Sequence, residues 1–106
     1  MSDIPRLGKK DVVILDLLPA GKEMYGLEMV KASGGKLDRT SVYVYLARLE
    51  EKGFLESRQV KQEGASGMPR RLYRITGAGV AALIANQTAL ESWKAALLNG
   101  PGGANA

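Results

Sequence analysis

The fold is decided by residues 37–53, which read LDRTSVYVYLARLEEKG. Asp38 is a residue type that caps helix N-termini, and Gly53 suits the left-handed position that closes a helix. Between them, large apolar residues recur at helical spacing and form one stripe: Val42, Tyr45, Leu46 and Leu49. The stretch therefore predicts a helix over residues 39–52 with one buried face.

The opposite face of this predicted helix carries small side chains rather than the Glu, Lys and Gln of an ordinary solvated face. Thr40, Val44 and Ala47 lie at its centre, and the flanks hold Ser41, Tyr43 and Arg48. Short hydroxyl and methyl groups let a helix approach base edges in a DNA groove. A helix covered on both sides by its own domain is the alternative that this stretch alone leaves open.

Length and composition exclude several classes of protein. A chain of 106 residues with 45% hydrophobic residues has room for one domain and a modest core. Neither Cys nor His is present, which excludes disulfides, thiolate zinc sites and the commonest general base, so we expect no enzyme and no cofactor. The longest apolar run, residues 12–15, is far too short to cross a bilayer, and the N-terminus lacks a signal peptide, which predicts a cytoplasmic protein.

The net charge of +4 is concentrated in one segment, because residues 57–75 hold five basic residues against Glu63 alone. The basic residues are Arg58, Lys61, Arg70, Arg71 and Arg74. Such a patch favours a polyanionic partner, since neutralising phosphates releases counterions. A merely solubilising surface is the alternative, and it fits scattered lysines better than a cluster of arginines.

The order of the predicted elements follows a helix-turn-helix. After a short arm (1–8), the pattern predicts helices over 9–18 and 24–33, a glycine-containing connection at 34–37 and then the helix at 39–52. From residue 54 the apolar period changes to two, which predicts strands over 54–61 and 70–75 around a loop at 62–69. A basic hairpin appended to a helix-turn-helix is a wing.

The last predicted helix, residues 77–99, begins after a capping Thr76 and carries an apolar seam at coiled-coil spacing. The seam consists of Leu83, Asn86, Leu90, Trp93 and Leu97. Because little chain remains to cover it, we expect a symmetric homodimer, the alternative being that the helix folds back on its own domain. The glycine-rich residues 100–106 are predicted to be disordered.

Trp93 has two interpretations. It is either an anchor buried in a dimer seam or, if two protomers leave a gap, a surface on which a flat aromatic effector stacks.

Three segments together resemble the PadR-type family of bacterial transcriptional regulators, in the short form with a single C-terminal helix. The resemblance covers residues 9–83 and is carried by residues 25–29 (YGLEM), 37–53, and 69–76 (PRRLYRIT) followed by Gly79. It implies a mainly α fold with a small β-hairpin, a winged helix-turn-helix (9–76) and a C-terminal dimerisation helix (77–99).

The resemblance also implies a dimeric repressor that binds a pseudo-palindromic operator in double-stranded DNA. Helix 39–52 would enter the major groove, and the hairpin would contact backbone or minor groove. On this interpretation the groove residues are Thr40, Ser41, Tyr43, Val44 and Arg48, and the phosphate contacts are Arg39, Lys61, Arg70, Arg71 and Arg74. Rival interpretations are a winged-helix protein-interaction module and an aromatic-ligand sensor that uses Trp93.

Overall fold

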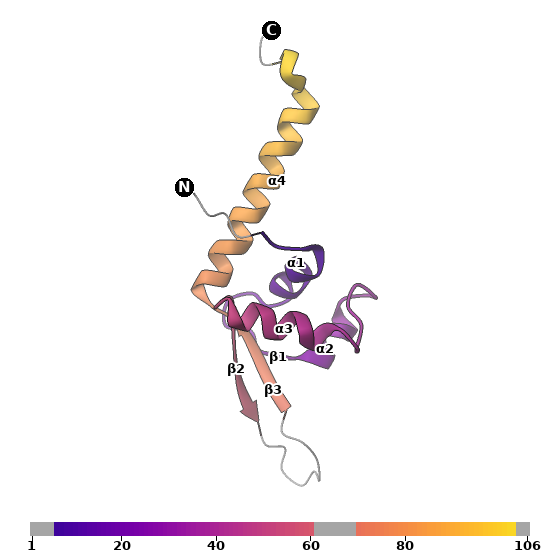
Figure 1. The fold of residues 1–106 in the computed structure, drawn as a ribbon, viewed down its shortest axis with the longest axis vertical. Coiled ribbons are helices and arrows are strands. Elements are labelled where there is room, and N and C mark those ends of the chain that lie inside the picture. Colours follow the sequence, from indigo (N-terminus) through magenta and orange to yellow (C-terminus); the bar gives the residue numbers. More distant parts are fainter. Residues whose placement is uncertain (1–5, 61–69, 104–106) are drawn as a thin grey trace.

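The computed structural model describes residues 6–60 and 70–103, with the side chains of 99–103 left out. In chain order its elements are α1 (Lys9–Asp16), β1 (Met24–Tyr25), α2 (Gly26–Ala32), α3 (Val42–Glu51), β2 (Leu55–Val60), β3 (Arg70–Ile75) and α4 (Gly77–Gly103). α1, α2 and α3 form a helical body, from which the β2–β3 hairpin extends on one side and α4 on the other (Figure 1). The predicted fold class, mainly helical with a winged helix-turn-helix, is confirmed.

The core forms where α1, α2 and α3 meet the sheet. Val42, Leu46 and Leu49 are fully buried there, as the apolar stripe predicts, while Tyr45 is only half-buried at the edge. The partners of this stripe include Ile14 of α1 and others from α1, α2 and the strands: Leu15, Leu18, Met29, Leu55, Tyr73 and Ile75. Burial of these side chains stabilises the body through removal of apolar surface from water.

α3 begins three residues later than the sequence predicts. Residues 39–41 form a turn because the Asp38 carboxylate accepts the N–H groups of Thr40 and Ser41, and the first helical residue is Val42. The predicted end of α3 is confirmed, since Gly53 has a φ of 83°. There the N–H of Phe54 bonds to the carbonyl of Leu49 and that of Gly53 to Glu50, the pattern of a Schellman motif.

The predicted second helix is wrong at its start. Met24 and Tyr25 form a short strand, β1, which pairs with Tyr73 and Leu72 of β3. The sheet is therefore three-stranded and antiparallel in the order β1-β3-β2, whereas the sequence predicted only the hairpin. In that hairpin Leu55 lies opposite Ile75. α1 likewise ends at Asp16, two residues before the predicted end.

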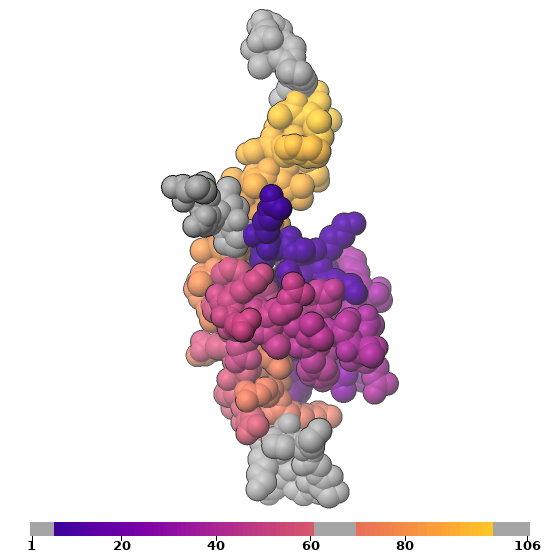
Figure 2. Space-filling view, in the orientation of Figure 1, coloured from indigo at the N-terminus to yellow at the C-terminus, as the bar shows by residue number. Residues whose placement is uncertain are grey.

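α4 is long, and only its first turns pack on the body. Ala82 is buried, and Val80 and Leu83 pack against the core, whereas the C-terminal part of the helix extends away from the body (Figure 2). The helix continues to Gly103, so the predicted end at residue 99 is wrong; the predicted disordered tail lies partly inside α4 and partly outside the described residues. No helix in the described part of the chain is long and apolar enough to cross a bilayer.

Candidate nucleic-acid interface

The outward face of α3 is open to solvent, including the residues that the sequence assigned to its centre. Val44 is 56% exposed and Tyr43 47%, and Thr40 and Ala47 are exposed as well. The alternative of a helix covered on both sides by its own domain is therefore wrong. A row of small side chains on an exposed helix is compatible with close approach to another surface.

The turn before α3 is held by Asp38. Its Oδ1 accepts the backbone N–H groups of Thr40 at 2.9 Å and Ser41 at 2.8 Å, and its Oδ2 accepts the Ser41 hydroxyl at 2.8 Å. These hydrogen bonds, chiefly those from Ser41, lower the pKa of Asp38 from its ordinary 3.8 to about 2. The carboxylate is therefore ionised at neutral pH.

A groove of about 560 Å³ lies between α2, α3 and the hairpin and brings together residues that are far apart in sequence. Tyr43 of α3 lines it together with Arg70 and Arg71 of β3. The Arg70 guanidinium lies 5.2 Å from the centroid of the Tyr25 ring, within cation–π distance. Tyr43, on the flank of the outward face of α3, therefore lies close to the two arginines of the hairpin.

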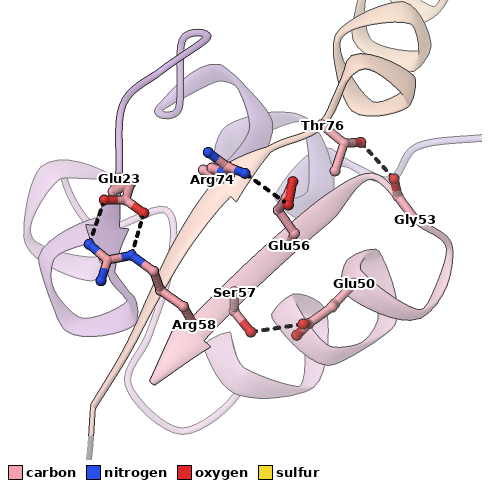
Figure 3. A network of polar contacts seen from close by, with 8 residues as sticks. All are labelled: Glu23, Glu50, Gly53, Glu56, Ser57, Arg58, Arg74 and Thr76. Atoms are coloured by element: carbon pink, nitrogen blue, oxygen red, sulfur yellow. Dashed lines mark hydrogen bonds and ion pairs between the residues drawn. The ribbon is translucent and has the colours of Figure 1, made fainter. Parts of the chain in front are cut away.

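Arg71 is fixed to α3 through two hydrogen bonds. Its Nη1 donates to the Ser57 hydroxyl at 2.9 Å, and that hydroxyl donates to Glu50 Oε2 of α3 at 2.8 Å. Figure 3 shows the second of these bonds between the strand and the helix. The side chain of Arg71 is thereby positioned relative to α3 rather than only relative to its own strand.

Arg74, which the sequence placed among the phosphate contacts, lies elsewhere. Its neighbours Tyr73 and Ile75 point into the core, so by strand alternation Arg74 points to the opposite face of the sheet. Arg70 shares that parity, but it lies at the far end of β3, where it borders the groove. There its Nη2 donates to Glu56 Oε1 at 3.1 Å, and the adjacent Arg58 makes a bidentate pair with Glu23 at 2.9 and 3.0 Å (Figure 3). Hydrogen bonds to these carboxylates raise the pKa of both arginines. The structure does not bring Arg74 together with the groove.

Two further predicted contact residues lie in the turn before α3 and on α3 itself. Arg39 is exposed in the turn before the helix, and Arg48 is exposed with its guanidinium 5.9 Å from the Tyr45 ring centroid. Lys10 of α1 reaches the other side, with Nζ 5.5 Å from the same ring. Lys61 lies outside the described residues.

Sequence reasoning missed several residues of the groove because they belong to β1, α2 and the two hairpin strands rather than to α3. They are Tyr25, Leu27, Glu28, Lys31, Gln59 and Tyr73. No local pattern marks them, since they meet only when β1 pairs with β3 and α2 packs on α3. Residues 25–29 carry part of the resemblance to the PadR-type family, but nothing in their sequence indicates that they border the interface.

The free part of α4 exposes most of the predicted seam. Leu90 is 50%, Trp93 63% and Leu97 61% exposed, Asn86 is half-buried, and Leu83 packs against its own core. Ile84 and Leu98, outside the predicted seam, are exposed as well. A cleft of about 970 Å³ between α1 and α4 is lined by Val12, Val13, Leu90 and Trp93, with Lys9, Lys10 and Lys36 also bordering it. Among the described residues no group of acidic side chains could hold a metal ion.

Solved structures share this fold. A PadR-like transcription factor from Bacteroides fragilis matches with a TM-score of 0.72 at 20% identity, over 85% of this chain and 87% of that one. A PadR family transcription regulator from Clostridium difficile matches with a TM-score of 0.70 at 26% identity, over 87% and 97%. Bacillus subtilis PadR, solved in complex with operator DNA, matches with a TM-score of 0.61 at 22% identity, over 71% of this chain and 44% of that one.

Among curated protein sequences, none matches significantly. The model of the transcriptional regulator PadR-like family, in contrast, matches residues 14–85, which include α2, α3, the hairpin and the first turns of α4. Because this match spans more than half of the sequence and agrees with the fold, the chain belongs to the PadR-like family of transcriptional regulators.

Proposed function

We propose that this chain is a sequence-specific DNA-binding regulator that acts as a homodimeric repressor, with α3 in the major groove and the β2–β3 hairpin as the wing. The observation that carries the proposal is the groove in which Tyr43 of α3 meets Arg70 and Arg71 of the hairpin. An exposed helix face of small residues beside two cations suits bases and phosphates together. The Bacillus subtilis relative, solved with operator DNA, supports this use of the fold.

In this proposal bases are read from the exposed side of α3 and from the turn before it. The residues are Thr40, Ser41, Tyr43, Val44 and Arg48. Because the Ser41 hydroxyl donates its hydrogen to Asp38, it can only accept from a base, which favours a base amino group. The Val44 side chain offers methyl groups to a thymine methyl.

Phosphates are bound on both sides of that face. The proposed phosphate contacts are Arg39 in the turn, Arg70 and Arg71 on the hairpin, and Lys61, which follows β2 in the sequence. Arg74 is left out of this set, because it pairs with Glu56 and does not line the groove.

A homodimer through α4 completes the proposal. Three large apolar side chains, Leu90, Trp93 and Leu97, are half or more exposed on α4, and a second copy of the helix would cover them. Two-fold symmetry then requires a pseudo-palindromic operator with half-sites separated by about 34 Å, one turn of DNA, or a multiple of it.

Selection of duplexes from a randomised library with the purified chain, followed by gel shifts at two salt concentrations, tests the proposal. We expect an enriched pseudo-palindrome whose affinity exceeds that of a scrambled duplex by roughly a thousandfold or more. A reporter placed behind that duplex should be repressed when the chain is expressed. Failure to enrich any sequence, with no salt-dependent retention of DNA, would favour the protein-interaction module instead.

A second candidate function, sensing of an aromatic effector, is supported by the cleft that contains Trp93. That cleft is apolar along α1 and α4 and large enough for a planar molecule. Titration with planar aromatic compounds should quench the fluorescence of Trp93, the single tryptophan of the chain. An unchanged emission across such compounds would remove this candidate and leave the DNA-binding proposal intact.

A further inference from the structure

Asp38 places a negative charge beside the residues proposed to meet DNA. It directly precedes Arg39 and Thr40, its side chain is 54% exposed, and its low pKa keeps it ionised at neutral pH. A carboxylate in such a position repels phosphate and should weaken binding to any duplex. Because Asp38 should reduce the affinity for DNA, we looked to its hydrogen bonds for a favourable contribution to recognition.

We propose that Asp38 is a positioning residue for base recognition, which holds the turn of residues 39–41 in one conformation so that Thr40 and Ser41 meet the bases with fixed geometry. This inference rests on the DNA-binding function proposed above. It concerns discrimination between sequences rather than total affinity.

Asp38 makes hydrogen bonds both to the turn and to the start of α3. Its carboxylate accepts the N–H groups of Thr40 and Ser41 and the Ser41 hydroxyl. Its backbone carbonyl accepts the N–H of Val42, the first residue of α3, at 3.1 Å. One residue therefore joins the turn to the start of the helix.

The chain just before Asp38 is fixed independently. Leu37 is buried, and its N–H donates to the hydroxyl of the buried Ser33 at 3.0 Å, while that hydroxyl donates to the carbonyl of Val30 at 2.8 Å. After the turn, Val42 is buried in the core. Residues 38–41 lie between these anchors. The Ser41 carbonyl accepts the N–H groups of Val44 and Tyr45, so the helix holds that end of the turn. The carboxylate of Asp38 holds the N–H group of Thr40 and both the N–H group and the hydroxyl of Ser41.

Lys10 offsets part of the unfavourable charge. Its Nζ lies 3.6 Å from Asp38 Oδ2 and 5.5 Å from the Tyr45 ring centroid, so it approaches the turn from α1. An exposed pair of this kind contributes little to stability, but it reduces the negative potential that a phosphate would meet. Asp38 can therefore hold the turn of residues 39–41 while repelling DNA phosphates less strongly.

Ordering a recognition loop before binding lowers the entropic cost of forming specific contacts. Without the carboxylate, the turn would sample several conformations, and the Ser41 hydroxyl would be free to donate as well as accept. Correct and incorrect bases would then be distinguished less well, while phosphate contacts from Arg70 and Arg71 would remain.

Two substitutions of Asp38 distinguish its effect on the conformation of the turn from the effect of its negative charge. Asp38→Ala removes every side-chain acceptor, whereas Asp38→Asn keeps one carbonyl oxygen for the N–H groups of the turn, and both remove the negative charge. The probes are the duplex selected by the wild-type chain and a scrambled duplex of equal composition. Asp16→Asn removes an exposed carboxylate of α1 as a charge control. Circular dichroism verifies that each variant is folded.

We expect Asp38→Ala to reduce the ratio of affinities for selected and scrambled duplexes by roughly tenfold, the order of one misread base pair. Its affinity for the scrambled duplex should stay equal or rise, and Asp38→Asn should recover much of the ratio. Asp16→Asn should leave the ratio unchanged.

The inference is overturned if Asp38→Ala leaves the ratio of affinities for selected and scrambled duplexes unchanged. It is also overturned if Asp38→Ala and Asp38→Asn increase the affinity for both duplexes equally, because the carboxylate would then act only by repelling phosphate. The proposed function fails on a different observation, namely a wild-type chain that prefers no duplex at all.

Discussion

Gly26 at the start of α2 lies against the ring of Tyr43 on α3. A Cβ added to Gly26 would lie 2.8 Å from Tyr43 Cε1, which is shorter than Cβ contacts in proteins, and 3.3 Å from Cδ1 of Leu46, which is tighter than most of them. Because glycine costs stability in a helix, its presence here is explained by the close approach of the two helices. Tyr43 is thereby seated at the wall of the groove next to the hairpin.

Gly26→Ala should displace the Tyr43 ring while leaving the fold intact. The ring is 47% exposed and can rotate away, so we expect a change in unfolding free energy within about 1 kcal/mol. Selective DNA binding should fall to the level of Tyr43→Ala, and the two substitutions combined should be no worse than Tyr43→Ala alone. Gel shifts on the selected duplex measure this double-mutant cycle, and fully additive losses would show that Gly26 does not act through Tyr43.

Gly79→Ala should destabilise the chain much more. Its Cβ would fall on the backbone carbonyl oxygen of Phe54 and lie 2.7 Å from Ile75 Cγ1, and backbone cannot rotate away as a side chain can. We expect a loss of about 2 kcal/mol or more in chemical denaturation. Gly77→Ala, two residues earlier in the same helix, is the matched control, because nothing lies within 4 Å of its added Cβ. Equal stability of the two variants would contradict the packing of α4 on Phe54.

Arg70→Ala combined with Arg71→Ala should weaken binding to selected and scrambled duplexes alike, because phosphates are common to both. Each lost phosphate contact should reduce the slope of log affinity against log salt by about one unit. Arg74→Ala is the internal comparison, since Arg74 pairs with Glu56 and does not line the groove. Gel shifts over a salt series give the slopes. A larger effect from Arg74→Ala than from the double substitution would contradict this assignment of the phosphate contacts.

Leu97→Glu should dissociate the proposed dimer without disturbing the protomer. Leu97 is 61% exposed on the free part of α4, so a charge there affects only a surface that a second copy would cover. We expect the dimer dissociation constant to rise roughly tenfold or more, measured by sedimentation. Thr88→Glu, exposed on the other side of α4, should have no such effect. A wild-type chain that sediments as a monomer at all concentrations would rule out the dimer.

Acid should remove the stabilising contribution of Asp38. Its folded pKa of about 2 lies below its ordinary 3.8, so the contribution is complete above the ordinary value and is lost as pH falls through the folded one. The stability difference between wild type and Asp38→Asn should therefore shrink as pH falls from 4 to 2. Urea titrations at several pH values test this, with Glu23→Gln expected to follow the same sign because Arg58 lowers the pKa of Glu23. A difference independent of pH would contradict the hydrogen bonding of Asp38.

The sequence by itself determined the elements whose pattern is local. The apolar stripe of α3 and its closure at Gly53 follow from the chemistry of consecutive residues, as does the switch to period two in the hairpin. Thr76 caps α4 as predicted, with its hydroxyl accepting the N–H of Gly79. These features agree with the structure because each depends on residues within a few positions of one another.

Only the tertiary structure decided features whose partners are distant in sequence. β1 has two residues and no period of its own, and it exists because β3 offers an open edge to Met24 and Tyr25. The sequence predicts Arg74 as a phosphate contact and places Arg58 in the basic segment, but in the fold they pair with Glu56 and Glu23, which are 18 and 35 residues away in the chain. No local pattern encodes these ion pairs, the pairing of β1 with β3, or the packing of Gly26 against the Tyr43 ring. Each forms only when the chain folds and brings distant residues together.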